Sequence, residues 1–164
     1  MPVVSLRYRF RQALRAPASA AYAWCTDFGP DDGTLFSETT RRTVRRLSED
    51  AIVMTDTTYP GGRPRRIRRL VRLHPGERAW TSTHLDGPFE GSQYWYHVYA
   101  DGPRRSYLEF VGLRLESRPR ALSRAEVARR ADECRRSDST EWRRRLAPAL
   151  ARDLGASQGS RDRS

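Results

Sequence analysis

The chain has 164 residues, of which 31 are basic and 20 acidic, so its formal net charge is +11. This length is typical of one domain and sufficient for a sizeable core. Only 37% of the residues are hydrophobic, but four Trp, seven Tyr and five Phe compensate, because each aromatic side chain buries a large area. The composition therefore argues against a disordered chain, and no apolar run approaches the about 20 residues of a membrane span.

All 31 basic residues are arginine, and the chain contains neither lysine nor asparagine. With abundant Ala, Gly and Pro, this pattern is typical of codon bias in a GC-rich genome, whereas proteins selected to bind phosphate usually mix Lys with Arg. The charge alone thus makes nucleic acid an unfavoured partner of the arginine-rich surface. Cys25 and Cys134 lie far apart without a CxxC motif. Free thiols, and no apolar signal-peptide run after Met1, predict a cytoplasmic protein.

The N-terminal region predicts one strand followed by two short helices. Polarity alternates over Val4–Arg15, which is typical of a half-buried antiparallel strand. An Ala-Pro step ends this strand, and Ala18–Phe28 carries its larger apolar residues on one helical face. Asp31 or Asp32 can cap a further helical turn that runs through Phe36.

A meander of strands follows, because segments rich in β-branched and aromatic residues alternate with Gly- and Pro-containing turns about every ten residues. With the first strand, this predicts one antiparallel sheet of about six to seven strands. The expected segments are Thr39–Ser48, Ala51–Tyr59, Arg65–Leu73, Arg78–Leu85, Phe89–Ala100 and Tyr107–Leu115.

A long helix is predicted near the C-terminus. Ser123 and Glu126 form a capping-box pattern that marks its start. A break near Ser137 is left open, and Pro148 should disturb the last turns. One stripe of this helix is apolar apart from a single carboxylate, and consists of Val127, Ala131, Cys134, Asp138, Trp142, Leu146 and Leu150.

We expect Gly155 to end the helix, so that residues 1–154 form a single domain and residues 155–164 a disordered polar tail.

The order of these elements resembles the START-like, or Bet v 1-like, helix-grip superfamily, which includes polyketide cyclases and coenzyme-Q-binding relatives. Leu14–Trp24 is similar to that family's first strand end, where Ala-Pro precedes a helix with a buried aromatic residue, and Cys25–Phe28 is similar to the usual end of that helix. The resemblance covers residues 4–154. It implies an α+β fold whose curved sheet wraps around the C-terminal helix and leaves a cavity for a hydrophobic, aromatic or lipid-like molecule. The C-terminal helical region here is longer and richer in Arg than is common in the family.

Both faces of Phe89–Ala100 carry aromatic residues, so the period of two does not determine which face lines a cavity. We expect the face with Trp95 and Tyr99 to do so, because it also carries Gln93 and His97, whose polar groups can orient a flat ligand. The alternative is that these aromatic residues belong to an ordinary core.

Polar candidates come from the neighbouring strands. His84 and His97 would form an acid–base pair if both pointed inward, although a scaffold or solvent-facing role is the ordinary alternative. Arg69 shares a face with apolar residues and is our candidate anchor for a carboxylate, phenolate or phosphate. Asp56 and Glu109 interrupt apolar runs, and each should either pair with an Arg inside or face solvent. The full set of predicted ligand-binding residues is Arg69, Trp80, His84, Gln93, Trp95, His97, Tyr99, Phe110 and Trp142.

The sequence predicts neither a metal site nor a cofactor, because two histidines lack a third ligand and no phosphate-binding glycine motif is present. The leading hypothesis is binding of a hydrophobic or aromatic small molecule between sheet and helix. The alternatives are a cyclase or aromatase acting in the same cavity, and an interaction protein whose basic helix contacts RNA or the ribosome. The oligomeric state is left open.

Overall fold

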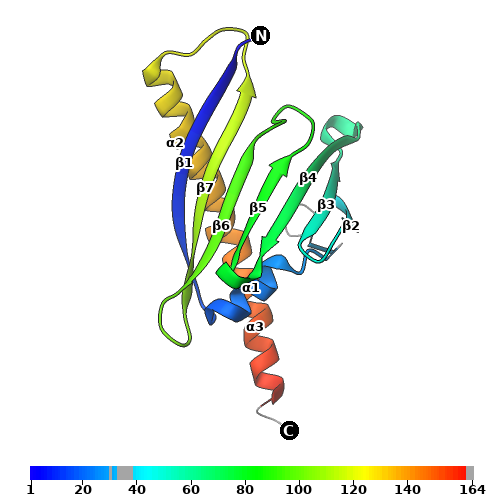
Figure 1. Ribbon diagram of the computed structural model, residues 1–164, viewed down its shortest axis with the longest axis vertical. Coiled ribbons are helices and arrows are strands. Elements are labelled where there is room, and N and C mark those ends of the chain that lie inside the picture. The colour runs from blue at the N-terminus through cyan, green and yellow to red at the C-terminus, as the bar shows by residue number, and fades with distance from the viewer. Residues whose placement is uncertain (30, 33–38, 162–164) are drawn as a thin grey trace.

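The computed structural model describes the backbone of residues 1–29, 31–32 and 39–161, and the side chains of these residues as far as Gly155. Its main feature is a seven-stranded antiparallel sheet with the strand order β1-β7-β6-β5-β4-β3-β2, whose concave side holds the long C-terminal helix (Figure 1). The strands are β1 (Val3–Leu14), β2 (Arg41–Arg46), β3 (Ala51–Thr58), β4 (Arg65–His74), β5 (Ala79–His84), β6 (Gln93–Ala100) and β7 (Ser106–Ser117).

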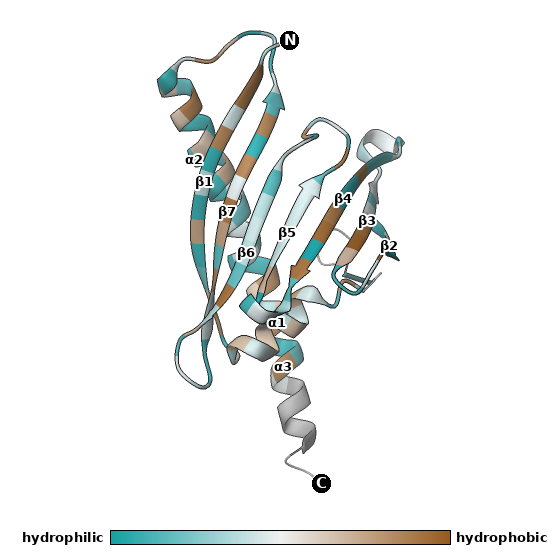
Figure 2. Ribbon diagram, in the orientation of Figure 1, coloured by the Kyte–Doolittle hydropathy of each residue, from teal (hydrophilic) through white to brown (hydrophobic). Residues whose placement is uncertain are grey.

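The predicted alternation of β1 is confirmed. Leu6 and Leu14 are fully buried, whereas Arg7 and Arg9 between them are exposed. Figure 2 shows the same alternation of hydrophobic and hydrophilic residues along β1 and β7. The two strands pair along their whole lengths, which closes the meander by bringing the first strand beside the last.

β6 begins at Gln93, four residues later than the sequence predicts. The intervening residues form a turn in which Gly87 and Gly91 adopt positive φ angles of 84° and 81°, a conformation that side chains with a Cβ rarely take. The turn is closed by the backbone N–H of His84, which donates to the carbonyl of Ser92, and by the N–H of Gly91, which donates to the carbonyl of His84. The backbone conformation of these two glycines forms a turn in place of the first residues of the predicted strand, so β6 is shorter than expected.

The helices lie on one side of the sheet. The α1 helix (Ala18–Thr26) is confirmed, but the second predicted helical turn lies outside the described residues from position 33 onward. Near the C-terminus, α2 (Arg124–Glu141) begins with the predicted capping box and shows no break at Ser137. None of the helices in the described part of the chain has the length and apolar character needed to cross a membrane.

The irregularity of the long helix lies beyond Ser137 and directly before Pro148, the residue that was expected to disturb the last turns. Trp142–Leu146 (η4) is π-helical, and α3 (Ala147–Arg161) follows it. In η4 the N–H of Ala147 donates to the carbonyl of Trp142, five residues back. Pro148 lacks an N–H and would crowd the preceding turn of a regular helix, so a wider turn accommodates it. The helix also continues past Gly155, since one glycine costs only about 1 kcal/mol of helix propensity.

The long helix is held against the sheet at two places by apolar packing. In the second half of α2, Cys134 belongs to a buried cluster with Leu6 and Tyr8 of β1. Further along, Leu146 at the end of the π-helical turn and Leu150 in α3 belong to the core cluster that also contains buried residues of β3, β4 and β5. The two anchored regions bracket the middle of the concave face.

A buried ion cluster reinforces the first of these attachments. The Glu116 side chain of β7 is only 4% exposed and receives Arg130 of α2 at 2.9 Å and Arg114 of β7 at 2.9 Å, with Arg118 as a third partner. Burial raises the pKa of Glu116, but the hydrogen bonds from Arg130 and Arg118 outweigh it, so the pKa is lowered. The carboxylate is therefore ionised and connects β7 to α2.

Replacement of Glu116 by Gln should lower the free energy of unfolding by about 1–3 kcal/mol, because three guanidinium groups lose their shared carboxylate in a largely buried place. Glu109→Gln on the same strand is the matched control, since its partner Arg11 is 68% exposed, and should cost less than about 1 kcal/mol. Urea titration followed by circular dichroism measures both values. Equal losses for the two variants would contradict the structural role of the cluster.

Candidate functional site

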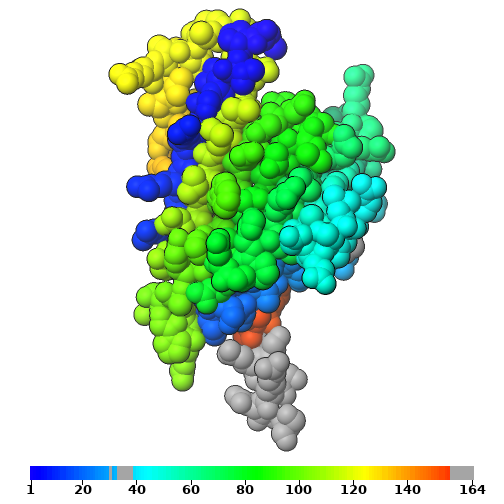
Figure 3. All heavy atoms as spheres, viewed as in Figure 1, coloured from blue at the N-terminus to red at the C-terminus, as the bar shows by residue number. Residues whose placement is uncertain are grey.

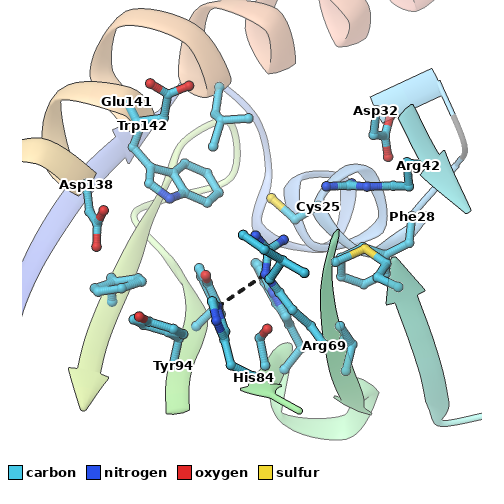
Figure 4. A pocket seen from close by; sticks show the side chains of 18 of the residues that line it. Cys25, Phe28, Asp32, Arg42, Arg69, His84, Tyr94, Asp138, Glu141 and Trp142 are labelled. Carbon is cyan, nitrogen blue, oxygen red and sulfur yellow. Dashed lines mark hydrogen bonds between the residues drawn. The ribbon is translucent and has the colours of Figure 1, made fainter. Parts of the chain in front are cut away.

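A cavity of about 330 Å³ lies between the inner face of the sheet and the helices α1, α2 and η4. Figure 4 shows Asp138, Glu141 and Trp142 reaching into it from the helix, and Arg69, His84 and Tyr94 from the strands. Eight aromatic side chains contribute to its wall, namely Trp24, Phe28, Trp80, Phe89, Tyr94, Tyr96, Phe110 and Trp142.

One row of cross-strand neighbours builds the aromatic floor of the cavity. The register places Trp80 of β5 opposite Tyr96 of β6, and Tyr96 opposite Phe110 of β7. Trp80 and Tyr96 stack with ring centroids 4.7 Å apart and planes inclined by only 2°, while Tyr96 meets Phe110 edge to face at 5.2 Å. Such pairs are favoured cross-strand contacts, so the floor is rigid and apolar.

A charged network forms the polar end of the cavity across β2, β3, β4 and β5. The guanidinium of Arg42 donates twice to the buried carboxylate of Asp56, at 2.7 and 2.9 Å. Nη1 of Arg69 donates to the same carboxylate at 2.9 Å, and Nε of Arg69 donates to Nε2 of His84 at 3.3 Å. The carboxylate of Asp56 is thus shared by two guanidinium groups, and Asp32 lies near Arg42 at the same end of the cavity (Figure 4).

The contact with Arg69 fixes the tautomer of His84. A guanidinium can only donate, so Nε2 of the imidazole must be the acceptor and Nδ1 must carry the proton. Burial, followed by the charges of Arg69 and Arg114, lowers the pKa of His84 to about 4. Nδ1 is itself buried and has no hydrogen-bond partner among the described residues. His84 is thus a neutral donor that lines the cavity, and its N–H lacks an acceptor within the protein described.

Two carboxyl groups at the wall of the cavity, Asp138 of α2 and Asp32 after α1, have raised pKa values. The hydroxyl of Tyr8 donates to Oδ2 of Asp138 at 2.6 Å. Burial raises the pKa of Asp138, and this outweighs the opposite effects of the Tyr8 hydrogen bond and the charge of Arg114. Asp32 has its pKa raised to about 6 by burial and by the nearby Asp27. Asp138 and Asp32 lie on opposite sides of the cavity in Figure 4.

Gly112 on β7 makes room for the Tyr8 ring. It is the register partner of Tyr8, and a Cβ added at this glycine would lie 2.9 Å from Cζ of the ring. Any other residue would push the ring away, and with it the hydroxyl that holds Asp138. The position of Asp138 in the cavity therefore depends indirectly on Gly112 of β7, which leaves room for the ring of Tyr8.

Five of the nine residues predicted to bind a ligand line the cavity: Arg69, Trp80, His84, Phe110 and Trp142. Their part in binding stays a prediction, but the structure brings them together. For Asp56 and Glu109 the sequence left two alternatives, an inward carboxylate paired with Arg or an outward one. Asp56 points inward and pairs with arginines. Glu109 lies on the outside of the sheet and pairs with Arg11.

The expectation that the Trp95 face of β6 lines the cavity is wrong. Tyr94 and Tyr96 line it instead, and the Trp95 side chain is half exposed on the outer face. The pairing with β5 and β7 decides this, because their inward residues have a clear apolar pattern and fix the register of β6. Four predicted residues consequently lie outside the cavity, namely Gln93, Trp95, His97 and Tyr99.

His84 and His97 also do not form the acid–base pair considered from the sequence. His84 faces the cavity, whereas His97 stacks on Tyr99 on the other side of the sheet at 3.8 Å. The described residues also contain no group of three His, Cys, Asp or Glu side chains placed to hold a metal ion.

Sequence reasoning missed several residues of the cavity. Asp138 gave a signal, because it is the one carboxylate in an apolar helical stripe. Arg42 and Arg114 gave none, since they stand among many arginines of similar surroundings in the sequence. Only the paired register of four strands brings Arg42 to Asp56 and Arg69 to His84.

No protein-family model matches the chain, and no curated protein matches it in sequence. Solved structures do match. The di-domain aromatase/cyclase StfQ of the steffimycin biosynthetic pathway superposes with a TM-score of 0.69 at 15% identity, over 93% of this chain and 52% of that one. Norcoclaurine synthase from Thalictrum flavum, in complex with dopamine and hydroxybenzaldehyde, gives 0.67 at 12% identity, over 93% and 87% of the two chains.

The Zhui aromatase/cyclase from Streptomyces sp. R1128 covers 94% of each chain, with a TM-score of 0.63 at 14% identity. The chain has the helix-grip fold. The fold class expected from the sequence is confirmed, including the curved sheet and the long C-terminal helix. In this helix-grip protein the cavity lies between these two elements, which is where the resemblance placed it.

The protonation state of His84 can be measured directly. We expect its imidazole to remain neutral, with the proton on Nδ1, as the pH falls from 8 to about 5, because its pKa is lowered to about 4. Long-range ¹H–¹⁵N spectra of the imidazole distinguish the two tautomers and the cation. A lowered folded-state pKa also means that the stability contributed by His84 is complete above about 6.5 and is lost as the pH falls toward 4. Titration of His84 near pH 6.5 would contradict the proposed tautomer and its buried site.

Proposed function

We propose that the cavity binds a compact, flat, largely aromatic molecule that presents an acceptor oxygen to Arg69 and His84. The observation that supports this most is the combination of a wall of aromatic rings with a buried donor, Nδ1 of His84, that has no partner in the described protein. Buried polar groups are nearly always hydrogen-bonded, so a bound molecule with an oxygen at this point would complete the site.

The charge at this end of the cavity favours an anionic or strongly polarised oxygen. Of the five N–H donors of Arg69, Asp56 and His84 engage two. Arg42 makes the twofold contact with Asp56, whereas Arg69 donates to this carboxylate through Nη1 alone. A carboxylate, phenolate or enolate would gain a charge-assisted hydrogen bond here, whereas a cation would be repelled.

The rest of the ligand is expected to be apolar and small. Transfer of an aromatic body from water to the floor formed by Trp80, Tyr96 and Phe110 removes apolar surface from water on both sides. A volume of about 330 Å³ is at the lower end of the range for small-molecule sites. The norcoclaurine synthase structure, which shares the fold, contains dopamine and hydroxybenzaldehyde, two small aromatic molecules with oxygen substituents.

Two naphthalene derivatives test the anchor. 2-Naphthoate should bind with quenching of the fluorescence of Trp80 and Trp142, and Arg69→Gln should weaken its binding about tenfold or more, because a charge-assisted hydrogen bond contributes about 1.5–3 kcal/mol. 2-Methylnaphthalene lacks the carboxylate, so the same substitution should leave its binding almost unchanged.

The matched control is Arg68→Gln on the same strand, since Arg68 points outward and pairs with Asp86. This variant should bind both compounds like the parent protein. If Arg69→Gln and Arg68→Gln bind 2-naphthoate equally well, the proposed anchor is wrong. If neither compound binds the parent protein, the proposed cavity function is wrong.

A second candidate function is catalysis of an aromatase or cyclase type, and Asp138 favours it. A carboxyl group with a raised pKa, held by the Tyr8 hydroxyl at the cavity wall, is suited to give a proton to a leaving hydroxyl or to take one from carbon. Cyclisation also requires that the reactive chain be held in one conformation, and an enclosing cavity would do this.

Asp138→Asn distinguishes catalysis from binding alone. If the protein is an enzyme of this class, a β-hydroxythioester probe should lose its α proton and β hydroxyl as water in the presence of the parent protein, and mass spectrometry should detect the α,β-unsaturated thioester. The Asn variant should reduce this rate at least a hundredfold and still bind 2-naphthoate, because Arg69 and His84 are unchanged. Absence of any dehydrated product with the parent protein would leave binding as the function and remove the catalytic alternative.

A further inference from the structure

The outer face of the sheet is a second surface with a distinct character. The helices and both core clusters lie on the inner face, so the strands themselves form the surface that Figure 3 presents. Residues of the strands that point outward include eight exposed arginines, and Glu109 is the one carboxylate among them. The chain as a whole has 31 basic and 20 acidic residues, so codon bias toward arginine does not explain this imbalance. The eight are Arg7, Arg9, Arg11, Arg41, Arg45, Arg66, Arg68 and Arg72.

A row of register partners crosses this face and has an exposed aromatic residue at its centre. Trp95 of β6 is 50% exposed and faces Val111 of β7 on one side and Thr81 of β5 on the other. Val111 pairs in turn with Arg9 of β1, and Thr81 with Arg72 of β4. Adjacent strands are about 4.8 Å apart, so each arginine stands roughly 10 Å from the tryptophan along the row. Neither Arg9 nor Arg72 forms an ion pair with any described carboxylate.

A second aromatic group lies beside this row. Tyr99 stacks between His97, at 3.8 Å, and Tyr107, at 5.2 Å between ring centroids. The guanidinium of Arg11 lies 5.1 Å from the centre of the Tyr107 ring. Rings and arginines thus alternate over the middle of the outer face of the sheet.

We propose that this outer face binds single-stranded nucleic acid, with a base stacked on Trp95 and the flanking phosphates near Arg9 and Arg72. An exposed ring on the outer face of a sheet offers a stacking surface to an unpaired base, and guanidinium groups on both sides match a polyanionic backbone. A duplex hides the faces of its bases and cannot use Trp95 in this way. A lipid bilayer is a poorer match, since Trp95 lies against His74 within the sheet, with planes 9° apart, and does not project from a loop. The surface uses none of the residues that line the cavity.

The test measures fluorescence anisotropy with a fluorescein-labelled oligouridylate and oligothymidylate of about 12 nucleotides, a typical site length. Binding should weaken with salt, and Trp95→Leu should weaken it about tenfold with little change in the salt dependence, because stacking is lost and charge is not. Arg9→Gln combined with Arg72→Gln should lower the slope of log affinity against log salt by about 0.7 for each arginine.

Arg129→Gln combined with Arg143→Gln is the matched control, because both arginines are exposed on the helical side and the change in net charge is the same. These two changes should leave the affinity nearly unaltered. Binding of 2-naphthoate should be the same in all these variants, and their circular dichroism should match the parent protein. The proposal is overturned if the single strands do not bind, if a duplex of the same length binds equally well, if Trp95→Leu has no effect, or if vesicles containing phosphatidylserine bind in preference.

Discussion

Attachment of the long helix to the sheet at two separated places is the constraint on which this structure depends. Around the middle of α2, Cys134 packs in a cluster with residues of β1, and Arg130 reaches the buried carboxylate of Glu116. Further along, Leu146 and Leu150 are buried against the other half of the sheet. A stiff helix fixed at both places cannot follow the curvature of the strands between them. The hollow under its middle is therefore a consequence of geometry, and side chains of moderate size leave it partly unfilled.

The chemistry of that hollow follows from the unequal distribution of charge around it. The strands provide the guanidinium of Arg69, which shares the carboxylate of Asp56 with Arg42, whereas the helix provides Asp138, whose pKa is raised by burial. A molecule between them meets N–H donors on one side and a carboxyl group of raised pKa on the other. This polarity across an aromatic slot orients a bound molecule, and orientation is needed both for selective binding and for any reaction.

The sequence predicted the order of elements well because local signals are strong in this chain. Polarity alternation identified β1, the capping box identified the start of α2, and glycine-containing turns separated the strands. It did not predict which face of β6 is inside, since Tyr94 and Trp95 are equally suited to a core and only pairing with β5 and β7 decides between them. Contacts such as Arg42 with Asp56 depend on register between strands, which one sequence does not specify.

The π-helical turn at Trp142–Leu146 keeps the apolar residues of the long helix, which are spaced four apart, on the face that is turned toward the sheet. In an α-helix, each step of four residues overshoots a full revolution by about 40°. Four such steps in succession lead from Cys134 to Leu150, so a regular helix would rotate Leu150 by about 160° and turn it toward water. The wider turn contains more residues per revolution and cancels much of this rotation, and Leu150 is completely buried. Removal of one residue from this turn would therefore act as a twist of the whole helix beyond it.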